Sequence, residues 1–328
     1  MNTKVAINGL GRIGRAILKL VIDEPGLDLV AVNDLVEAEN LAYLLRFDTV
    51  YGRFPKPVVL EGGHLTIAGH KVRTLQDRDP LKLRWKDLGV ELVFECTGAL
   101  KRREDLEKHI QAGARFVLLS APSQGVEVET VVHGANAPQG ASGIISCASC
   151  TTNCITPIVE VIGRRIGIKK AVMTTVHAYT SSQSIIDGPS KAFRRGRAAA
   201  ANLVLATTGA ALATTRALPE YTGLFDGIAI RAPLPVGSIA DLTFVASRRT
   251  SVEEVNRLVL QGMPFRDAYK KIGAAIEGNN FTYSTHLQHS HEGSLSNLQN
   301  KEIAHMMDTV LSRFNFDKVN SALNSLLL

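Results

Sequence analysis

Short apolar runs alternate with helix-like segments over the first half of the chain. Runs of strand length occupy residues 3–8, 26–34, 91–96, 115–119 and 143–147. Between them, residues 15–22 and 101–112 carry apolar positions at helical spacing. Strands that alternate with helices indicate a parallel sheet covered on both faces, so we expect an α/β fold with a doubly wound sheet.

The pattern changes near Cys150. We expect a helix over residues 151–164, with Pro157 in its first turns, where a proline is tolerated. Strand-like runs follow at 170–177, 227–233 and 238–247. Residues 198–215 are mostly Ala, Thr and Gly, and we expect them to form a small-residue helix inside the domain. From Ser251 onward the strand-like runs stop, which favours a helical or loop-like C-terminal part.

A glycine-rich turn follows the first predicted strand and opens a helix. Gly9, Gly11 and Gly14 form the pattern G-x-G-x-x-G, and Asp34 ends the next predicted strand. Glycines let the backbone approach a pyrophosphate, and a carboxylate after the second strand accepts hydrogen bonds from a ribose. A carboxylate also repels a 2′-phosphate, so the pattern predicts NAD rather than NADP. The alternative is a structural glycine turn with an ordinary aspartate at the end of a strand.

A cysteine and a histidine form a second candidate pattern. Cys150 precedes the predicted helix, whose N-terminus would stabilise a thiolate. His177 ends the strand-like run 170–177, where it could act as a base beside that nucleophile. A lone histidine at the end of a strand is more often structural, so spacing alone leaves both interpretations open. Cys147-x-x-Cys150 has no second such pair and no histidine at ligand spacing, so no metal is predicted.

Composition and charge limit the class of protein. Of the 328 residues, 45% are hydrophobic and 21% charged, which excludes a disordered chain. Four cysteines exclude a disulfide scaffold, and we expect Cys96, Cys147 and Cys154 to be small buried apolar residues. The net charge is +6, but the basic residues are scattered, so no specific nucleic-acid partner is expected. No leader peptide or membrane span is predicted, which favours a cytoplasmic protein.

Several segments together resemble the glyceraldehyde-3-phosphate dehydrogenase family over about residues 1–256. These segments are INGLGRIGR (7–15), AVND (31–34), ECTG (95–98), SAPS (120–123), SCTTNC (149–154), TTVHAYT (174–180), RRGRAAA (194–200), TTGAA (207–211), FDGIAIR (225–231) and SVEEVN (251–256). The resemblance implies a glycolytic oxidoreductase, a homotetramer in the family. It would convert glyceraldehyde 3-phosphate and inorganic phosphate to 1,3-bisphosphoglycerate with NAD.

The resemblance also implies roles for individual residues. Cys150 would attack the aldehyde carbon, His177 would take the proton of the resulting hydroxyl, and phosphate would then attack the thioester. The residues that match the family's site for attacking phosphate are Ser149, Thr151, Thr208 and Gly209, and those that match its site for the substrate phosphate are Thr180 and Arg231, with Arg195 nearby. The residues that match its cofactor contacts, besides the three glycines, are Arg12, Ile13, Asp34, Arg78, Thr97, Gly98 and Ser120.

Most of these phosphate-site residues have a simpler alternative. Ser149, Thr151 and Thr208 could be helix caps, and both roles can hold at once. Arg195 and Arg231 could form surface or interface salt bridges.

The sequence departs from the family after SVEEVN. It lacks a WYDNE-type segment, whose asparagine holds the nicotinamide carboxamide in the family; Trp85 is the only tryptophan. Residues 251–328 instead resemble the C-terminal end of argininosuccinate lyase, through SVEEVNRLVLQGMPFRDAYKKIG (251–273) and HSHEGSLSN (289–297). The serine-rich loop of that lyase is absent, so lyase activity is not expected. His286, His289 and His291 are expected to be structural or surface residues.

These observations divide the chain into three expected parts. They are a Rossmann-type NAD-binding domain over 1–149, a partial α+β catalytic domain over 150–250, and an atypically helical segment over 251–328. Three functions remain open from the sequence: the dehydrogenase of glyceraldehyde 3-phosphate, an NAD-binding chimeric protein with weak or no catalysis, and a dehydrogenase of erythrose 4-phosphate. A homo-oligomer is expected.

Overall fold

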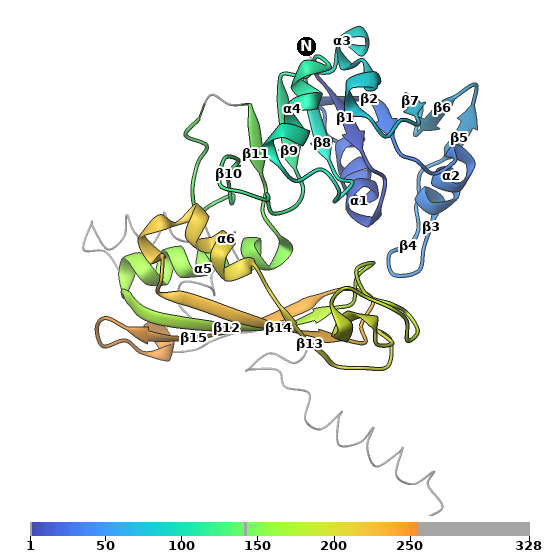
Figure 1. Cartoon of the computed structure of the whole chain (residues 1–328). Helices are drawn as coiled ribbons and strands as arrows, with labels where there is room; N and C mark the ends of the chain where they lie inside the picture. The colour runs from blue at the N-terminus through green and yellow to red at the C-terminus, as the bar shows by residue number, and fades with distance from the viewer. Residues whose placement is uncertain (1, 141–142, 255–328) are drawn as a thin grey trace, which may run out of the picture. The chain divides into compact units, whose positions relative to one another are not determined.

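The computed structural model describes residues 2–140 and 143–254 (Figure 1). The chain divides into two compact units, residues 1–250 and 251–328. Only residues 251–254 of the second unit are described, so the expected helical C-terminal segment and its three histidines lie outside the described residues. The elements below all belong to the first unit.

A nine-stranded sheet forms the N-terminal half of the described structure. Its strand order is β10-β11-β9-β8-β1-β2-β7-β6-β5. The strands are β1 (Thr3–Asn8), β2 (Leu27–Asn33), β5 (Val58–Glu61), β6 (His64–Ile67), β7 (His70–Leu75), β8 (Leu92–Glu95), β9 (Phe116–Leu119), β10 (Glu129–Thr130) and β11 (Ile144–Ser146). From β10 to β7 all neighbours are parallel, whereas β5, β6 and β7 form an antiparallel edge. The chain leaves β1 toward β2 on one side and later reaches β8 on the other, which makes a topological switch point at β1.

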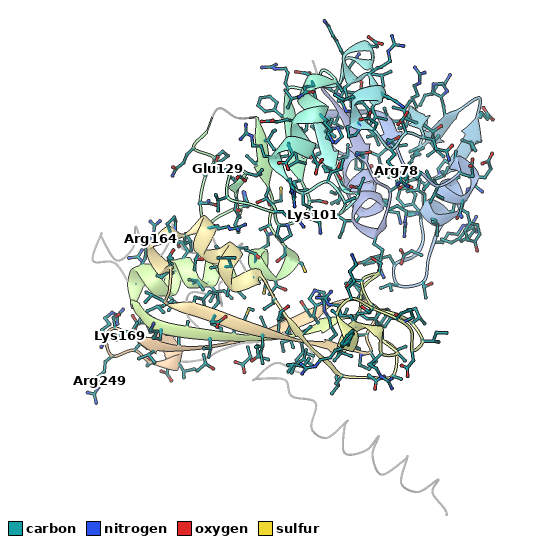
Figure 2. All side chains as sticks on the ribbon, in the orientation of Figure 1. Arg78, Lys101, Glu129, Arg164, Lys169 and Arg249 are labelled. Atoms are coloured by element: carbon teal, nitrogen blue, oxygen red, sulfur yellow. The ribbon has the colours of Figure 1, made fainter. Side chains whose placement is uncertain are left out.

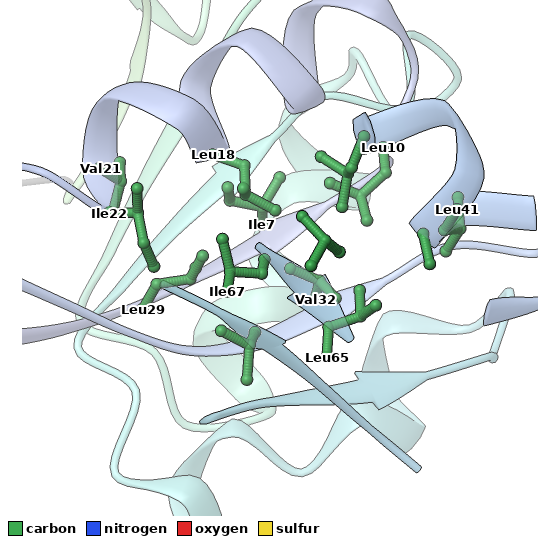
Figure 3. Close-up of a cluster of buried hydrophobic side chains, with 14 of the residues drawn as sticks. Ile7, Leu10, Leu18, Val21, Ile22, Leu29, Val32, Leu41, Leu65 and Ile67 are labelled. Carbon is green, nitrogen blue, oxygen red and sulfur yellow. The ribbon is translucent and has the colours of Figure 1, made fainter. Parts of the chain in front are cut away.

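Helices cover this sheet and bury its apolar faces. They are α1 (Arg12–Val21), α2 (Ala38–Arg46), α3 (Trp85–Leu88) and α4 (Arg103–Gln111), together with the 3-10 helix η1 (Pro80–Leu83). A short hairpin, β3 (Phe47–Asp48) and β4 (Gly52–Arg53), follows α2. Ile7 and Leu29 of the sheet pack with Leu18 of α1 in one core cluster (Figure 3). Trp85, Val90 and Val93 belong to a second cluster.

A four-stranded sheet forms the C-terminal half of the described structure. Its order is β13 (Val204–Thr207), β14 (Phe225–Ala232), β12 (Ile168–Ala178) and β15 (Ser238–Ala246). Two helices, α5 (Cys150–Arg165) and α6 (Ala210–Ala217), lie side by side on one face of this sheet (Figure 1). The Oγ1 atoms of Thr156 and Thr214 are 2.9 Å apart and join the two helices by a hydrogen bond. The 3-10 helices η2 (Phe193–Gly196) and η3 (Pro219–Tyr221) lie in the connections.

The expected α/β architecture is confirmed, but two local expectations were wrong and one group of strands was missed. Residues 198–215 do not form one helix, because β13 occupies part of the stretch and α6 begins only after Gly209. Pro157 lies inside α5 rather than in its first turns, so that helix lacks one backbone hydrogen bond. The strands between residues 58 and 75 were missed, because glycine turns break them into runs too short to show a clear period.

Within residues 2–140 and 143–254, the structure contains no helix that is both long and apolar enough to cross a membrane.

The glycine turn after β1 leads to a prediction about stability, in which Gly11 serves as the control for Gly14. A Cβ at Gly14 would overlap the carbonyl oxygen of Gly9, whereas a Cβ at Gly11 would meet no atom within 4 Å. We therefore expect Gly14→Ala to lower the free energy of unfolding by about 3 kcal/mol, since backbone must move to admit the methyl group. Gly11→Ala should unfold at nearly the wild-type temperature. Thermal unfolding followed by circular dichroism measures both, and equal midpoints for the two variants would contradict the packing argument.

Candidate active site

The predicted nucleophile lies at the N-terminus of a helix. Cys150 is the first residue of α5, and its side chain is exposed. Ser149 caps the helix, because its Oγ accepts a hydrogen bond from the Thr152 backbone N–H at 3.1 Å. Free backbone N–H groups and the helix dipole favour a negative charge in this first turn. The sequence thus places the Cys150 sulfur at the N-terminal end of a 16-residue helix.

The turn before Cys150 has an unusual backbone conformation. Ala148 is buried and has φ +57°, in the left-handed region that side chains rarely adopt. Its N–H donates to Ser146 Oγ at 3.1 Å, and the Ser146 hydroxyl donates to the Ala121 carbonyl oxygen at 2.7 Å. This turn connects β11 of the large sheet to α5, so local hydrogen bonds hold the strained residue two positions before the candidate nucleophile.

His177 faces Cys150 from the C-terminal end of β12. Its Nε2 lies 3.2 Å from Cys150 Sγ, and its ring is half-buried. The structure therefore brings the two residues together across the junction of a helix and a strand. A histidine nitrogen at this distance can exchange a proton with the sulfur or with a group bound to it.

Arg231 fixes the other side of the His177 ring. β12 pairs with β14 in parallel, and this register sets His177 beside Arg231. Arg231 Nη1 lies 2.8 Å from His177 Nδ1 and donates to the Ala178 carbonyl oxygen at 3.0 Å. That carbonyl oxygen is also 2.7 Å from Nδ1. Because arginine only donates and a carbonyl only accepts, Nδ1 has a partner whether or not it carries a hydrogen. The ring can thus keep its orientation as its protonation changes.

A second arginine lies near the first. Burial lowers the pKa of Arg231 below its usual value, the positive charge of Arg195 lowers it further, and Cys150 opposes the shift. Arg195 Nη1 donates to Ser182 Oγ at 2.7 Å, and Ser182 Oγ is 2.9 Å from Thr180 Oγ1. Two guanidinium groups that repel each other and a pair of hydroxyls beside one of them form a place suited to an anion. Sequence reasoning missed Ser182, because nothing in TSSQ distinguishes it from a solvent-exposed serine.

The remaining residues predicted for phosphate lie at helix N-termini. Thr151 is buried in the first turn of α5. Gly209 is the N-cap of α6, and Thr208 Oγ1 accepts a hydrogen bond from the Ala210 N–H at 3.1 Å. Thr208 therefore accepts from a first-turn N–H of α6 from the position before the N-cap, whereas Gly209 at the N-cap itself makes no side-chain cap bond. Within the described residues no hydrogen bond joins Thr208 or Gly209 to Cys150, His177 or Arg231, so their part in the site stays a prediction.

The glycine turn lies at the carboxyl ends of the parallel strands. Gly9 has φ +94°, and a Cβ there would come within 2.6 Å of the Thr97 backbone nitrogen. Gly14 lies in α1 against the Gly9 carbonyl, so these two glycines are required by packing. Gly11, the N-cap of α1, faces open space. The backbone around Gly11 thus offers room for a ligand at the N-terminus of a helix, which suits a pyrophosphate.

The other residues predicted to contact a cofactor lie around the same edge. Asp34 follows β2, and its Oδ2 accepts a hydrogen bond from the Leu10 N–H at 2.6 Å. Thr97 and Gly98 follow β8, Ser120 follows β9, and Ile13 of α1 is 55% exposed although apolar. Arg78 is exposed just beyond β7 (Figure 2). This edge is the usual ligand position of a doubly wound sheet, so the residues present fit a dinucleotide.

Arg12 takes part in a small cavity that the sequence did not indicate. The cavity has a volume of about 290 Å³, and Arg15, Asp48, Tyr179 and Pro235 also line it. Arg12 Nη1 donates to the Pro235 carbonyl oxygen at 3.2 Å. Burial lowers the pKa of Arg15. Backbone hydrogen bonds from Tyr51 and Val50 lower the pKa of Asp48, although burial opposes them. Arg12 therefore links the glycine-turn helix to the loop after β14.

The other cysteines differ from the expectation of small buried residues. Cys154 is exposed, and Cys96 and Cys147 are only partly buried. Burial nevertheless raises the pKa of Cys96 to about 11, although a hydrogen bond from Ser120 opposes the shift, and burial also raises the pKa of Cys147. Among residues 2–140 and 143–254, no group of three or more His, Cys, Asp or Glu side chains is arranged to hold a metal ion.

Comparisons with known proteins agree with this geometry. Residues 3–103 match the family model described as "Glyceraldehyde 3-phosphate dehydrogenase, NAD binding domain", and residues 149–275 match "Glyceraldehyde 3-phosphate dehydrogenase, C-terminal domain". The second match extends beyond the end of the resemblance placed at residue 256.

Individual proteins with the name glyceraldehyde-3-phosphate dehydrogenase also match over most of their length. The one from Clostridium pasteurianum is 44% identical over 258 residues, which are 77% of each chain. The one from Geobacillus stearothermophilus is 44% identical over 259 residues, 78% of this chain and 77% of the relative. The one from Clostridium acetobutylicum is 40% identical over 285 residues, 85% of each chain. By these matches the chain belongs to the glyceraldehyde-3-phosphate dehydrogenase family.

Proposed function

We propose that the protein oxidises glyceraldehyde 3-phosphate to 1,3-bisphosphoglycerate with NAD and inorganic phosphate. The contact between Cys150 Sγ and His177 Nε2 carries this proposal. It joins a sulfur at a helix N-terminus to a base whose ring is held from its other nitrogen. Family membership supports the choice of substrate, since the relatives named above carry that substrate in their names.

The chemistry follows from the positions of the two side chains. Cys150 gives its proton to His177 Nε2 and attacks the aldehyde carbon as a thiolate, and the backbone N–H groups at the start of α5 stabilise the negative charge that develops on the carbonyl oxygen. The proton on Nε2 then passes to that oxygen and gives the hemithioacetal. His177 Nε2 takes the proton of the hemithioacetal hydroxyl as the carbon is oxidised. Bound NAD would supply the hydride acceptor for that carbon. Inorganic phosphate then attacks the resulting thioester, which releases the acyl phosphate and returns Cys150 to a thiolate.

Two phosphate groups need separate places in this reaction. Thr180, Arg195 and Arg231 suit the phosphate of the substrate, because the mutual repulsion of the two arginines is relieved by a dianion between them. Ser149, Thr151, Thr208 and Gly209 suit the attacking phosphate, because they bring hydroxyls and free N–H groups at the N-termini of α5 and α6.

We propose that the dinucleotide lies at the carboxyl edge of the large sheet. The pyrophosphate would lie against Gly11 and the N-terminus of α1, with Arg12 and Ile13 beside it, and Asp34 would accept hydrogen bonds from a ribose. Thr97, Gly98 and Ser120 follow the neighbouring strands, and Arg78 lies beyond β7.

Further properties are proposed from the family resemblance and from the sequence. The family resemblance supports a homo-oligomer and a cytoplasmic protein. Residues 251–275 fall within the match to the family's C-terminal domain. For residues 276–328, the likeness of HSHEGSLSN (289–297) to the lyase supports a segment that differs from that of the family and adds no lyase activity. An NAD-binding protein without turnover is the competing function, because no WYDNE-type segment is present. Erythrose 4-phosphate remains a competing substrate, because Thr180 and Arg231 would contact only its phosphate.

The first test is the appearance of NADH from glyceraldehyde 3-phosphate, NAD and inorganic phosphate. We expect phosphate-dependent turnover that Cys150→Ser abolishes, since a serine hydroxyl is a far weaker nucleophile at neutral pH. His177→Asn should lower kcat by about a hundredfold or more through loss of the base. Unchanged turnover in Cys150→Ser would refute the mechanism. Normal NAD binding without turnover in the wild type would show that the protein is an NAD-binding protein without catalysis. Faster oxidation of erythrose 4-phosphate than of glyceraldehyde 3-phosphate would identify erythrose 4-phosphate as the substrate.

Cofactor choice provides a second prediction. The carboxylate of Asp34 should repel the 2′-phosphate of NADP, so kcat/KM with NAD should exceed that with NADP by about a hundredfold or more. Asp34→Asn retains an oxygen for the Leu10 N–H but removes the charge. This variant should therefore lower the ratio of kcat/KM with NAD to kcat/KM with NADP, mainly by raising kcat/KM with NADP. Equal use of both cofactors by the wild type would rule out the ribose contact.

The cysteines provide a third prediction. Iodoacetamide at pH 7 should modify Cys150 first, because it is exposed, lies at a helix N-terminus and contacts His177. Cys96 and Cys147 should react slowest in the folded protein, since burial raises the pKa of both thiols and leaves little thiolate. Peptide mapping by mass spectrometry gives the four rates. His177→Asn should slow Cys150 and leave the exposed Cys154 unchanged; similar rates at all four cysteines would contradict the activated-nucleophile argument.

A further inference from the structure

A hydrogen-bonded network built around buried polar side chains lies under the cofactor edge and takes no part in the chemistry above. Its centre is Glu95, the last residue of β8, which is 0% exposed. Its Oε2 accepts hydrogen bonds from Asn8 Nδ2 at 2.6 Å and from His109 Nε2 at 3.1 Å. Its Oε1 accepts from the Thr97 N–H at 2.8 Å and from the Thr97 hydroxyl. A buried carboxylate is tolerated only when donors surround it in this way.

The hydrogen bonds of His109 determine which nitrogen carries the proton. His109, on α4, is 0% exposed, and its Nδ1 accepts a hydrogen bond from Trp85 Nε1 at 3.0 Å. Since an indole N–H can only donate, Nδ1 has no hydrogen while this bond is present. Nε2 then carries the hydrogen and donates it to Glu95. The indole of Trp85 therefore holds the histidine as a neutral donor to a buried carboxylate.

The network continues sideways to the neighbouring strand. Asn33 Nδ2 donates to Asn8 Oδ1 at 2.7 Å and to the Asp77 carbonyl oxygen at 2.8 Å, and the Asp77 N–H donates to Asn33 Oδ1 at 2.9 Å. Asn8 and Asn33 are the last residues of β1 and β2, and both are buried. The same set of bonds thus joins the carboxyl ends of β1, β2 and β8 to the segment after β7.

Each end of the network lies next to a residue proposed to contact the cofactor. Asn8 precedes Gly9, Asn33 precedes Asp34, and Asp77 precedes Arg78, while Thr97 is bonded to Glu95 directly. The tolerance at this edge is small, because even a methyl group on Gly9 would come within 2.6 Å of the Thr97 nitrogen. A shift of Glu95 would therefore move Thr97 against the glycine turn.

From this arrangement we infer that Glu95, His109 and Trp85 are positioning residues for the dinucleotide: they hold the glycine turn and the Thr97 turn at the separation that the cofactor needs, without touching it. The inference rests on the proposed function, because it assumes that the dinucleotide lies at this edge. It predicts that breaking the network weakens cofactor binding selectively and leaves the Cys150–His177 chemistry intact.

His109→Leu tests the inference, because leucine fills the space but neither donates to Glu95 nor accepts from Trp85. We expect NAD to bind about tenfold more weakly by calorimetry, since a buried carboxylate loses a donor and Thr97 is held less firmly. KM for NAD should rise by a similar factor, with kcat and the KM for phosphate within about twofold of wild type. His109→Gln, which again offers a donor and an acceptor, should recover most of the affinity.

A matched control separates positioning from general stability. Leu106→Ala lies on the same helix, α4, at a fully buried position in an apolar cluster. It should lower the unfolding temperature at least as much as His109→Leu but leave NAD affinity within about twofold at a temperature where both are folded. Trp85 is the only tryptophan, so its emission reports the indole N–H bond directly. The emission should change in His109→Leu, return toward wild type in His109→Gln and stay unchanged in Leu106→Ala.

The outcomes distinguish this inference from the proposed reaction. Wild-type NAD affinity in His109→Leu, or an equal loss in Leu106→Ala, would overturn the positioning role. A wild-type protein that binds NAD without forming NADH would overturn the proposed reaction but leave the calorimetric comparison valid, and a wild type that binds no NAD would overturn both. If His109→Leu does not fold, Glu95→Gln keeps the volume and turns an amide toward the Asn8 and His109 donors, so the same loss of NAD affinity is expected.

Discussion

The pairing of β12 with β14 is the constraint on which the candidate active site depends. In this parallel register His177 lies beside Arg231, and the adjacent Ala178 carbonyl completes the support of the ring. A slip of one residue would turn every side chain of β12 to the opposite face and remove His177 from Cys150. The slip is resisted on two sides, because β12 also pairs with β15 along nearly its whole length. Cys150, the candidate nucleophile, is exposed and lies on a helix, whereas His177, the candidate base, is fixed by an inner strand of the sheet.

In the large sheet, buried side chains hold the turns at its carboxyl edge in place. Its carboxyl edge must leave an open space at Gly11 while the surrounding turns stay close enough to define that space. Glycines at positions 9 and 14 allow the close approach, and a buried carboxylate with donors on both oxygens holds the turns together. In the small sheet, Arg231 holds His177 at the end of β12. In the large sheet, Glu95 holds the Thr97 turn beside the glycine turn at the end of β8.

Much of this arrangement could be predicted from the sequence, and the parts that could not share a physical cause. Gly9, Gly11, Gly14 and Asp34 form a local pattern with a known geometry, and Cys150 precedes a helix that the apolar period shows clearly. The contact of Arg231 with His177 depends on which strands pair and in which register, and a single sequence carries no direct signal of that pairing.

The local errors have the same origin. Residues 198–215 look helical by composition, but four of them pair with β14 and only the part after Gly209 becomes α6. Cys154 is apolar by type, yet its position on α5 leaves it exposed. In each case tertiary contacts, which propensity does not contain, decide the outcome.

The left-handed residue before the nucleophile limits how this protein can diversify. At Ala148 an L-residue costs about 1–2 kcal/mol relative to an unstrained backbone, and a β-branched side chain would cost more. Substitutions at this buried position are therefore confined to small residues or to those that tolerate a positive φ. A library that randomises the residues around Cys150 would lose its bulky and β-branched variants at Ala148 through misfolding rather than through altered chemistry.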